Sequence, residues 1–134
     1  MKKMSILVIM LVLLGVYCFT SNKKNLDLPD ASKVEFGHVH GGAMTTVYEC
    51  DQNKVSSLIK NIEEKSSYSK ESVNDNPNGV DYIKMKMDTK TYYVYERNGK
   101  TYIEEPYNGI WKIPSDLCKS IKNNKDKLIV EYKD

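Results

Sequence analysis

Residues Val80–Ile113 read VDYIKMKMDTKTYYVYERNGKTYIEEPYNGIWKI, a stretch in which β-rich runs alternate with short turn-forming pairs. The pair Asn98-Gly99 predicts a two-residue type I′ turn, because Asn and Gly tolerate the positive φ angles that this turn requires. Further turn signals precede and follow it. We therefore predict an antiparallel β-meander over residues 80–113.

Two-residue turns also fix the register of the strands that they join. One such turn is expected at Asn98-Gly99 and another at Asp88-Thr89. Because successive side chains on a strand point to opposite faces, this register decides which residues share a face. The predicted cross-strand pairs are Arg97 with Lys100, Tyr95 with Tyr102, Val94 with Ile103, Tyr82 with Tyr95, and Ile83 with Val94.

One face of the predicted meander is apolar and the other carries tyrosines among charged residues. The apolar face, expected in the core, consists of Ile83, Met85, Tyr92, Val94 and Ile103. The second face consists of Tyr82, Lys84, Lys86, Tyr93, Tyr95, Tyr102 and Glu104. We interpret it as a solvated or partner-binding face with four candidate contact residues, Tyr82, Tyr93, Tyr95 and Tyr102, since Tyr offers rigid amphipathic area. The alternative is an aromatic ladder that only stabilises the sheet.

Composition limits the chain to one small domain behind a leader. The chain has 134 residues, of which 40% are hydrophobic and 28% are charged. Lys2 and Lys3 account for the net charge of +2, because residues 1–21 contain no acid. The rest of the chain is neutral, which argues against nucleic acid as a partner.

The first 21 residues are typical of a membrane-targeting leader. Lys2 and Lys3 precede an apolar run over residues 5–19, the pattern of a signal sequence. The run is short for a spanning helix, which needs about 20 apolar residues. We therefore expect an extracytoplasmic protein that is membrane-associated through this leader or secreted.

The processing of the leader stays open between three outcomes. Cys18 stands where a bacterial lipoprotein is lipidated, but Tyr17 replaces the small residue expected before that Cys. An uncleaved anchor and ordinary cleavage near Thr20 or Ser21 are the alternatives.

The rest of the chain predicts a tether at residues 22–32 and a single extracytoplasmic α+β domain at residues 33–134. Its sheet is expected to have five to seven antiparallel strands. Strands are predicted at residues 33–40, 43–50 and 127–132, besides the meander, with a turn at Gly41-Gly42. A helix is predicted at about residues 52–65, a polar loop at 66–78, and a second short helix at about 115–123.

No sequence motif identifies an active site. The chain lacks G-x-S-x-G, H-E-x-x-H, S-x-x-K and a phosphate-binding glycine loop, so no catalytic residue and no cofactor are expected. His38 and His40 are weak candidate metal ligands, because i, i+2 spacing on a strand puts both on one face. A small secreted metal- or thiol-dependent enzyme that uses His38, His40 and Cys50 is the alternative function. Cys50 and Cys118 either form a disulfide or are buried as small hydrophobic residues.

The segment YIEEPYNGIWKI at Tyr102–Ile113, with LPDASKVEF at Leu28–Phe36, resembles a family of small exported Gram-positive domains of unknown function. The family pattern is E-x-P-Y-x-G-I-Y-K-I, and Trp111 stands here in place of its second Tyr. The similar region covers most of residues 26–123. Some relatives are appended to β-lactam-responsive sensor metallopeptidases, and others follow a lipoprotein-like leader. The resemblance implies an exported, non-catalytic accessory or sensing module. From the tyrosine-bearing face we predict that it recognises a protein or cell-wall partner outside the membrane.

Overall fold

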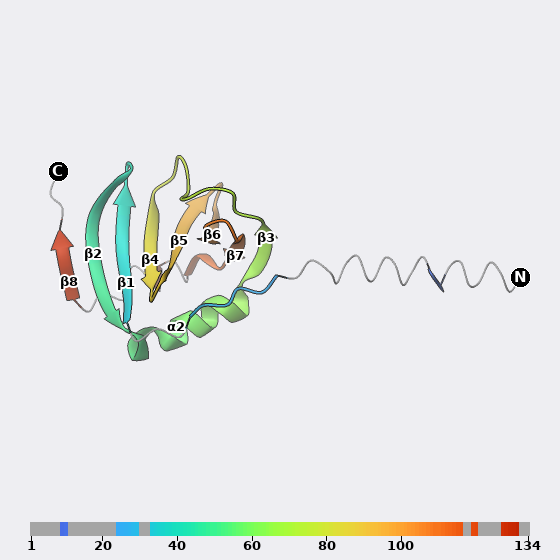
Figure 1. Cartoon of the computed structure of the whole chain (residues 1–134), viewed down its shortest axis with the longest axis horizontal. Coiled ribbons are helices and arrows are strands. Elements are labelled where there is room, and N and C mark those ends of the chain that lie inside the picture. The colour runs from blue at the N-terminus through green and yellow to red at the C-terminus, as the bar shows by residue number, and fades with distance from the viewer. Residues whose placement is uncertain (1–8, 11–23, 30–32, 117–118, 121–126, 132–134) are drawn as a thin grey trace, which may run out of the picture.

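A single antiparallel sheet dominates the structure, and one helix crosses its lower end (Figure 1). The structure is a computed structural model that describes residues 9–10, 24–29, 33–116, 119–120 and 127–131. Eight strands form the sheet in the order β3-β7-β6-β5-β4-β1-β2-β8. The α+β class predicted from the sequence is confirmed.

The elements follow the chain with one helix between the second and third strands. The strands are β1 (Lys33–His40), β2 (Ala43–Asp51), β3 (Ser67–Lys70), β4 (Tyr82–Met87), β5 (Lys90–Arg97), β6 (Lys100–Glu105), β7 (Gly109–Ile113) and β8 (Lys127–Glu131). The helix is α2 (Gln52–Lys65).

The meander has the predicted register. Strands β4 and β5 pair around Asp88-Thr89, and β5 and β6 pair around Asn98-Gly99. Asn98 has a φ of 53° and Gly99 a φ of 71°, as a type I′ turn requires. All five predicted cross-strand pairs occur: Arg97 with Lys100, Tyr95 with Tyr102, Val94 with Ile103, Tyr82 with Tyr95, and Ile83 with Val94.

The other strands extend the meander on both sides. Strand β1 pairs with β4 and continues through the Gly41-Gly42 turn into β2, and β8 pairs with β2 at one edge of the sheet. At the other edge, β3 pairs with β7. The prediction of a loop over residues 66–78 is wrong at Ser67–Lys70, which form β3. Ser67–Lys70 is short and largely exposed, so its sequence lacks the apolar alternation by which strands are recognised.

The apolar stripe of α2 covers the core face of the sheet. Leu58, Ile59 and Ile62 are buried, and Ile62 has no exposed surface. They join one hydrophobic cluster with the predicted apolar face of the meander, every residue of which is at most 2% exposed. The face expected in the core is therefore confirmed.

An extended segment, residues 24–29, packs against the core beside α2. Leu26 and Leu28 are buried in the main hydrophobic cluster. The Trp111 indole Nε1 donates to the Lys24 carbonyl over 2.8 Å, and the Leu28 amide donates to Glu63 Oε1 over 2.7 Å. Leu26 and Leu28, which lie within the predicted tether at 22–32, are therefore part of the packed domain.

Two sequence expectations are not shown by the structure. The second helix expected at about 115–123 is not shown, since residues 117–118 and 121–126 lie outside the described part of the chain. The leader at 1–21, including Cys18, also lies outside it except for residues 9–10. Among the described residues, no helix is both long and apolar enough to cross a membrane.

We expect Ile62→Ala to lower the free energy of unfolding by about 2–5 kcal/mol, because it opens a cavity between α2 and the sheet. Lys60→Ala, two residues away on the same helix, is the control, since the Lys60 side chain is 75% exposed. Chemical denaturation of both variants measures the difference. Equal losses would mean that α2 does not bury this stripe.

Candidate functional site

The face that carries the tyrosines is crossed by residues 71–81, which we call the strap. The strap connects β3 to β4 and is held by side-chain hydrogen bonds. Ser72 Oγ donates to Glu104 Oε1 over 2.5 Å, and Arg97 Nη2 donates to the Asn78 carbonyl over 2.7 Å. Both Glu104 and Arg97 belong to the tyrosine face, so the strap lies over part of that face.

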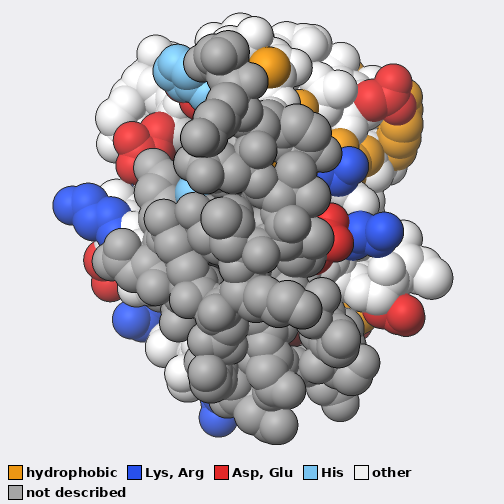
Figure 2. Space-filling view, turned by 90° about the vertical axis from the view of Figure 1, so that its left-hand side faces the viewer, with side chains coloured by type: hydrophobic (Ala, Val, Ile, Leu, Met, Phe, Trp, Pro, Cys, Tyr) orange, Lys and Arg blue, Asp and Glu red, His pale blue; other side chains and the backbone are white. Residues whose placement is uncertain are grey.

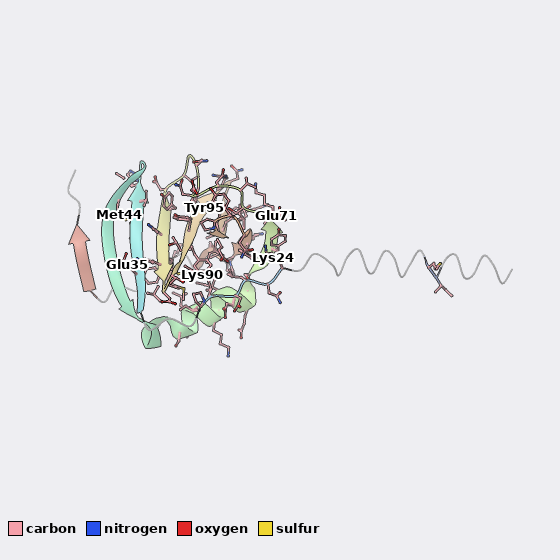
Figure 3. All side chains as sticks on the ribbon, in the orientation of Figure 1. Lys24, Glu35, Met44, Glu71, Lys90 and Tyr95 are labelled. Atoms are coloured by element: carbon pink, nitrogen blue, oxygen red, sulfur yellow. The ribbon has the colours of Figure 1, made fainter. Side chains whose placement is uncertain are left out.

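The centre of the tyrosine face is buried, contrary to the sequence analysis. Tyr95 is 4% exposed and Glu104 is 2% exposed, whereas we expected both at a solvated face. Ser72 of the strap is also buried. The alternation of residues in β5 and β6 assigns the face correctly, but it cannot show that a distant loop covers that face. Figure 3 labels Tyr95 in the upper half of the sheet, among closely spaced side chains.

The four predicted tyrosines lie together as two aromatic pairs. Tyr82 and Tyr93 meet edge to face with ring centroids 5.1 Å apart, and Tyr95 and Tyr102 stack at 5.7 Å. The Arg97 guanidinium lies 5.4 Å from the Tyr95 ring centroid, in range for a cation–π contact. Tyr82, Tyr93 and Tyr102 are half-buried, so their rings remain partly accessible.

Two exposed apolar side chains adjoin this face. Val73 is 73% exposed on the strap, and Tyr107 is 66% exposed at the turn between β6 and β7. The Tyr107 hydroxyl donates to Asp75 Oδ1 of the strap over 2.6 Å, which holds the ring in place. This hydrogen bond raises the pKa of Tyr107. The pKa of Tyr93 is also raised, first by its burial and then by the charges of the residues around Tyr93. Val73 and Tyr107 are exposed, and together with the half-buried Tyr93 they form what we call the strap surface.

The histidines lie at the end of the sheet next to the Gly41-Gly42 turn. His40 Nδ1 contacts Asp81 Oδ2 at 2.5 Å, and the Gly41 amide donates to Asp81 Oδ1 over 3.0 Å. The Gly41 amide, and then His40, lower the pKa of Asp81. His38 is half-buried nearby, in a groove of about 500 Å³. Figure 2 shows histidine and acidic side chains together at the upper left.

In the described part of the chain, the histidine pair is not joined by a third potential metal ligand. Among the described residues, no group of three or more His, Cys, Asp and Glu is arranged to hold a metal. The described residues that line the groove include neither Ser nor Cys. The side chains of Cys50 and Cys118 lie outside the described part of the structure.

Several residues of the segment that ends the meander have structural roles. Glu104 accepts the bond from the strap, and Glu105 accepts bonds from Lys90 at 3.1 Å and from the Asn108 amide at 2.7 Å. A Cβ on Gly109 would lie 2.7 Å from the buried Trp111 ring, so this position requires glycine. Glu104 and Gly109 of this segment thus have structural roles in the domain.

Glu104 and Gly109 lie in a region that matches a known family. The chain matches the model of the DUF5301 family, described as a domain of unknown function, over residues 22–112. The chain belongs to the DUF5301 family. No curated protein and no solved structure matches it. The DUF5301 region spans β1–β6, α2, the strap and nearly all of β7.

The residues that join the strap to the rest of the DUF5301 domain could not be found from the sequence. Ser72 and Asp75 occur in the polar segment 66–78, which lacks apolar periodicity and is predicted as a loop, and Asp81 falls at the start of the predicted meander. The one available signal was Glu104, a charged residue beside apolar ones in the middle of a strand. A buried carboxylate needs hydrogen-bond donors, and here a donor comes from the strap.

Alkaline pH should destabilise the domain through its buried tyrosines. Burial, followed by the charge of Glu104, raises the pKa of Tyr95 above its ordinary value of 10.0. The stabilisation is therefore complete below pH 10 and is lost as the pH rises from there toward the folded-state pKa, because the unfolded state ionises first. We expect Tyr95→Phe to reduce the slope of unfolding free energy against pH between about pH 10 and 12. An unchanged slope, measured by urea denaturation at each pH, would place Tyr95 in contact with water.

Proposed function

We propose that this DUF5301 domain is a non-catalytic recognition module that acts outside the membrane and binds a protein or cell-wall partner through the strap surface. The observation that carries the proposal is the exposure of Val73 and Tyr107 on a loop and turn that are fixed to one another. Single exposed hydrophobic residues are ordinary on protein surfaces. An exposed tyrosine whose hydroxyl is hydrogen-bonded to Asp75 of the strap is held in place and is better suited to binding.

The hydrogen bonds of the strap support this proposal energetically. Ser72, Asp75 and Asn78 each connect the strap to the meander through a hydrogen bond. A partner that binds a loop already held in place loses less conformational entropy than one that must order the loop. Tyr and Trp are enriched among the residues that dominate binding energy, and Tyr107 is accessible on the described surface.

The cellular setting that we propose comes from the leader and from the resemblance to exported Gram-positive domains. The basic and apolar pattern of residues 1–21 supports export and membrane association. The resemblance supports an accessory or sensing role next to a membrane protein of the sensor-metallopeptidase kind. In that role the domain contributes recognition and another protein contributes catalysis.

Site-specific cross-linking tests the strap surface. A photoreactive benzoylphenylalanine at position 107 should cross-link one specific protein on intact cells, or bring the domain down with purified cell-wall sacculi. The same group at Lys60, which is exposed on α2, is the control for non-specific capture. Equal cross-linking from both positions, or none from either, would contradict the proposal.

Substitution of the exposed tyrosine measures its contribution to binding. We expect Tyr107→Ala to weaken capture by about tenfold, or about 1.4 kcal/mol, as for a residue at the centre of an interface. Tyr68→Ala is the matched control, because Tyr68 packs against Trp111 on the core side of the sheet. Thermal melting of both proteins separates lost binding from lost folding. Loss of binding in the Tyr68 variant alone would assign the interface to another surface.

Membrane attachment gives a separate prediction for the leader. If Cys18 is lipidated, Cys18→Ala should move the protein from the membrane fraction to the soluble or secreted fraction. Fractionation followed by intact-mass measurement reads the outcome. Unchanged membrane retention at the full-length mass would indicate an uncleaved anchor, and a mass reduced by the leader without lipid would indicate ordinary cleavage.

A further inference from the structure

Two hollows meet at the end of the sheet that carries the Gly41-Gly42 turn. The first is the groove of about 500 Å³ beside the histidines. The second, of about 640 Å³, lies between the Gly41-Gly42 turn and strap residues 76–80, at the upper end of the sheet in Figure 1. We call it the glycine hollow. Asp81 and Tyr82 line both hollows, so the two adjoin along this segment. Both volumes are typical of small-molecule sites, which measure about 300–1,000 Å³.

Tyr82 presents an aromatic ring where the two hollows adjoin. Its side chain is half-buried, and its ring meets Tyr93 edge to face, with the ring planes at 79°. An edge-to-face contact uses at most one face of each ring, so at least one face of the Tyr82 ring lies outside this contact. A pyranose ring carries C–H groups on its faces, and these pack well against an aromatic face.

Asp81 supplies a carboxylate whose orientation is fixed. Its Oδ2 contacts His40 Nδ1 at 2.5 Å, and its Oδ1 accepts a hydrogen bond from the Gly41 amide over 3.0 Å. Each carboxylate oxygen has two lone-pair sites, so each can accept one further hydrogen bond. Asp81 is exposed, which leaves these sites accessible to a ligand. Hydroxyl groups are suitable donors for them.

Two asparagine amides line the glycine hollow. No hydrogen bond joins the side-chain amide of Asn76 or Asn78 to another described residue. The Asn78 carbonyl accepts a hydrogen bond from Arg97 over 2.7 Å, and Pro77 is buried, so this part of the strap is held in position. A carboxamide both donates and accepts hydrogen bonds, as a sugar hydroxyl does.

The charge of the lining disfavours anionic ligands. The described residues that line the two hollows include no Lys and no Arg, whereas Asp81 and Glu96 contribute carboxylates. Phosphate and carboxylate groups would therefore be repelled at this end of the sheet. Uncharged hydroxyl groups avoid this repulsion, because they donate to carboxylates and exchange hydrogen bonds with amides.

We propose that the two hollows form a binding site for an uncharged saccharide. A pyranose ring stacks on Tyr82, and its hydroxyls donate to the Asp81 carboxylate. Other hydroxyls exchange hydrogen bonds with the Asn76 and Asn78 amides. The polar groups are already held in position before binding, so the complex loses less conformational entropy than one that must order its site.

The saccharide site is distinct from the strap surface. Val73, Tyr93 and Tyr107 line neither hollow. The two regions adjoin where the Tyr82 ring contacts Tyr93. The inference therefore goes beyond the recognition function proposed above and does not rest on it.

Titration of the full-length chain at neutral pH tests the site, in a phosphocholine detergent that carries no sugar of its own. Backbone amide signals of Gly42 and Gly79, and side-chain amide signals of Asn76 and Asn78, report binding. The probes are two uncharged trisaccharides, triacetylchitotriose and maltotriose. Sorbitol, which has the hydroxyls but no ring, is the ligand control. We expect saturable shifts with at least one trisaccharide below about 20 mM, and none with sorbitol.

The two trisaccharides also distinguish the source of the sugar. Tighter binding of triacetylchitotriose would support the site and assign it to acetamido glycans, such as those of a cell wall. Tighter binding of maltotriose would support it as a site for free glucose oligosaccharides. Equal binding would support it as well and assign recognition to the pyranose ring itself.

Matched variants locate the groups that recognise the sugar. Asn76→Ala should weaken binding about fivefold through lost hydrogen bonding. Asn74→Ala is the control, because Asn74 is exposed on the same strap and lines neither hollow. Tyr82→Leu, which removes the aromatic face, should also weaken binding about fivefold, whereas Tyr82→Phe should bind as the parent does. Thermal melting of each variant separates lost binding from lost folding.

Several results would overturn the saccharide site. One is the absence of saturable shifts with both trisaccharides, and another is equal binding of sorbitol. Equal affinities of the Asn76 and Asn74 variants, or of the two Tyr82 variants, would also contradict it, as would shifts confined to Val73 and Tyr107. Tyr107→Ala should leave every titration unchanged, so failure of either site leaves the other testable.

Discussion

The rest of the structure depends on the positive φ angles at the two short turns of the meander. Asn98 and Gly99 permit a two-residue connection, and Asp88, with a φ of 53°, permits the other. A connection longer by one residue would move every side chain of the next strand to the opposite face. The turns thus place Val94 and Ile103 on the core face, in one cluster with the apolar stripe of α2, and Tyr95 and Glu104 on the face that the strap crosses. Both the core and the candidate site follow from that choice.

The centre of the second face of the sheet, which the strap crosses, is buried and polar. A sheet with one solvated face can keep a charged row without further contacts. Here the Glu104 side chain is buried and requires hydrogen-bond donors, and the Ser72 hydroxyl is one of them. Removing a donor from a buried carboxylate is costly, whereas an exposed pair contributes little. The position of the strap is therefore tied to the meander more firmly than its polar sequence implies.

Local rules were sufficient for the parts of the fold that are close in sequence. The turn residues and the alternation of the meander predicted its register pair by pair, and the stripe at Leu58 and Ile62 predicted the packing of α2. Local rules failed for β3 and for the burial of Tyr95. Both depend on segments distant in the chain, β7 in one case and the strap in the other. The contact of His40 with Asp81 spans 41 residues and has no local signal.

The chain packs on its own core from Lys24 onward, and this would limit how far a domain anchored at its N-terminus stands from a membrane. The Lys24 carbonyl accepts a hydrogen bond from the Trp111 indole, and Leu26 is buried in the core. If the protein is attached at Cys18, five residues lie between that residue and Lys24, and the chain from one to the other spans at most about 20 Å even when fully extended. Such a domain would move in a thin layer parallel to the membrane. It would meet partners that are also held at that height far more often than molecules free in the surrounding medium.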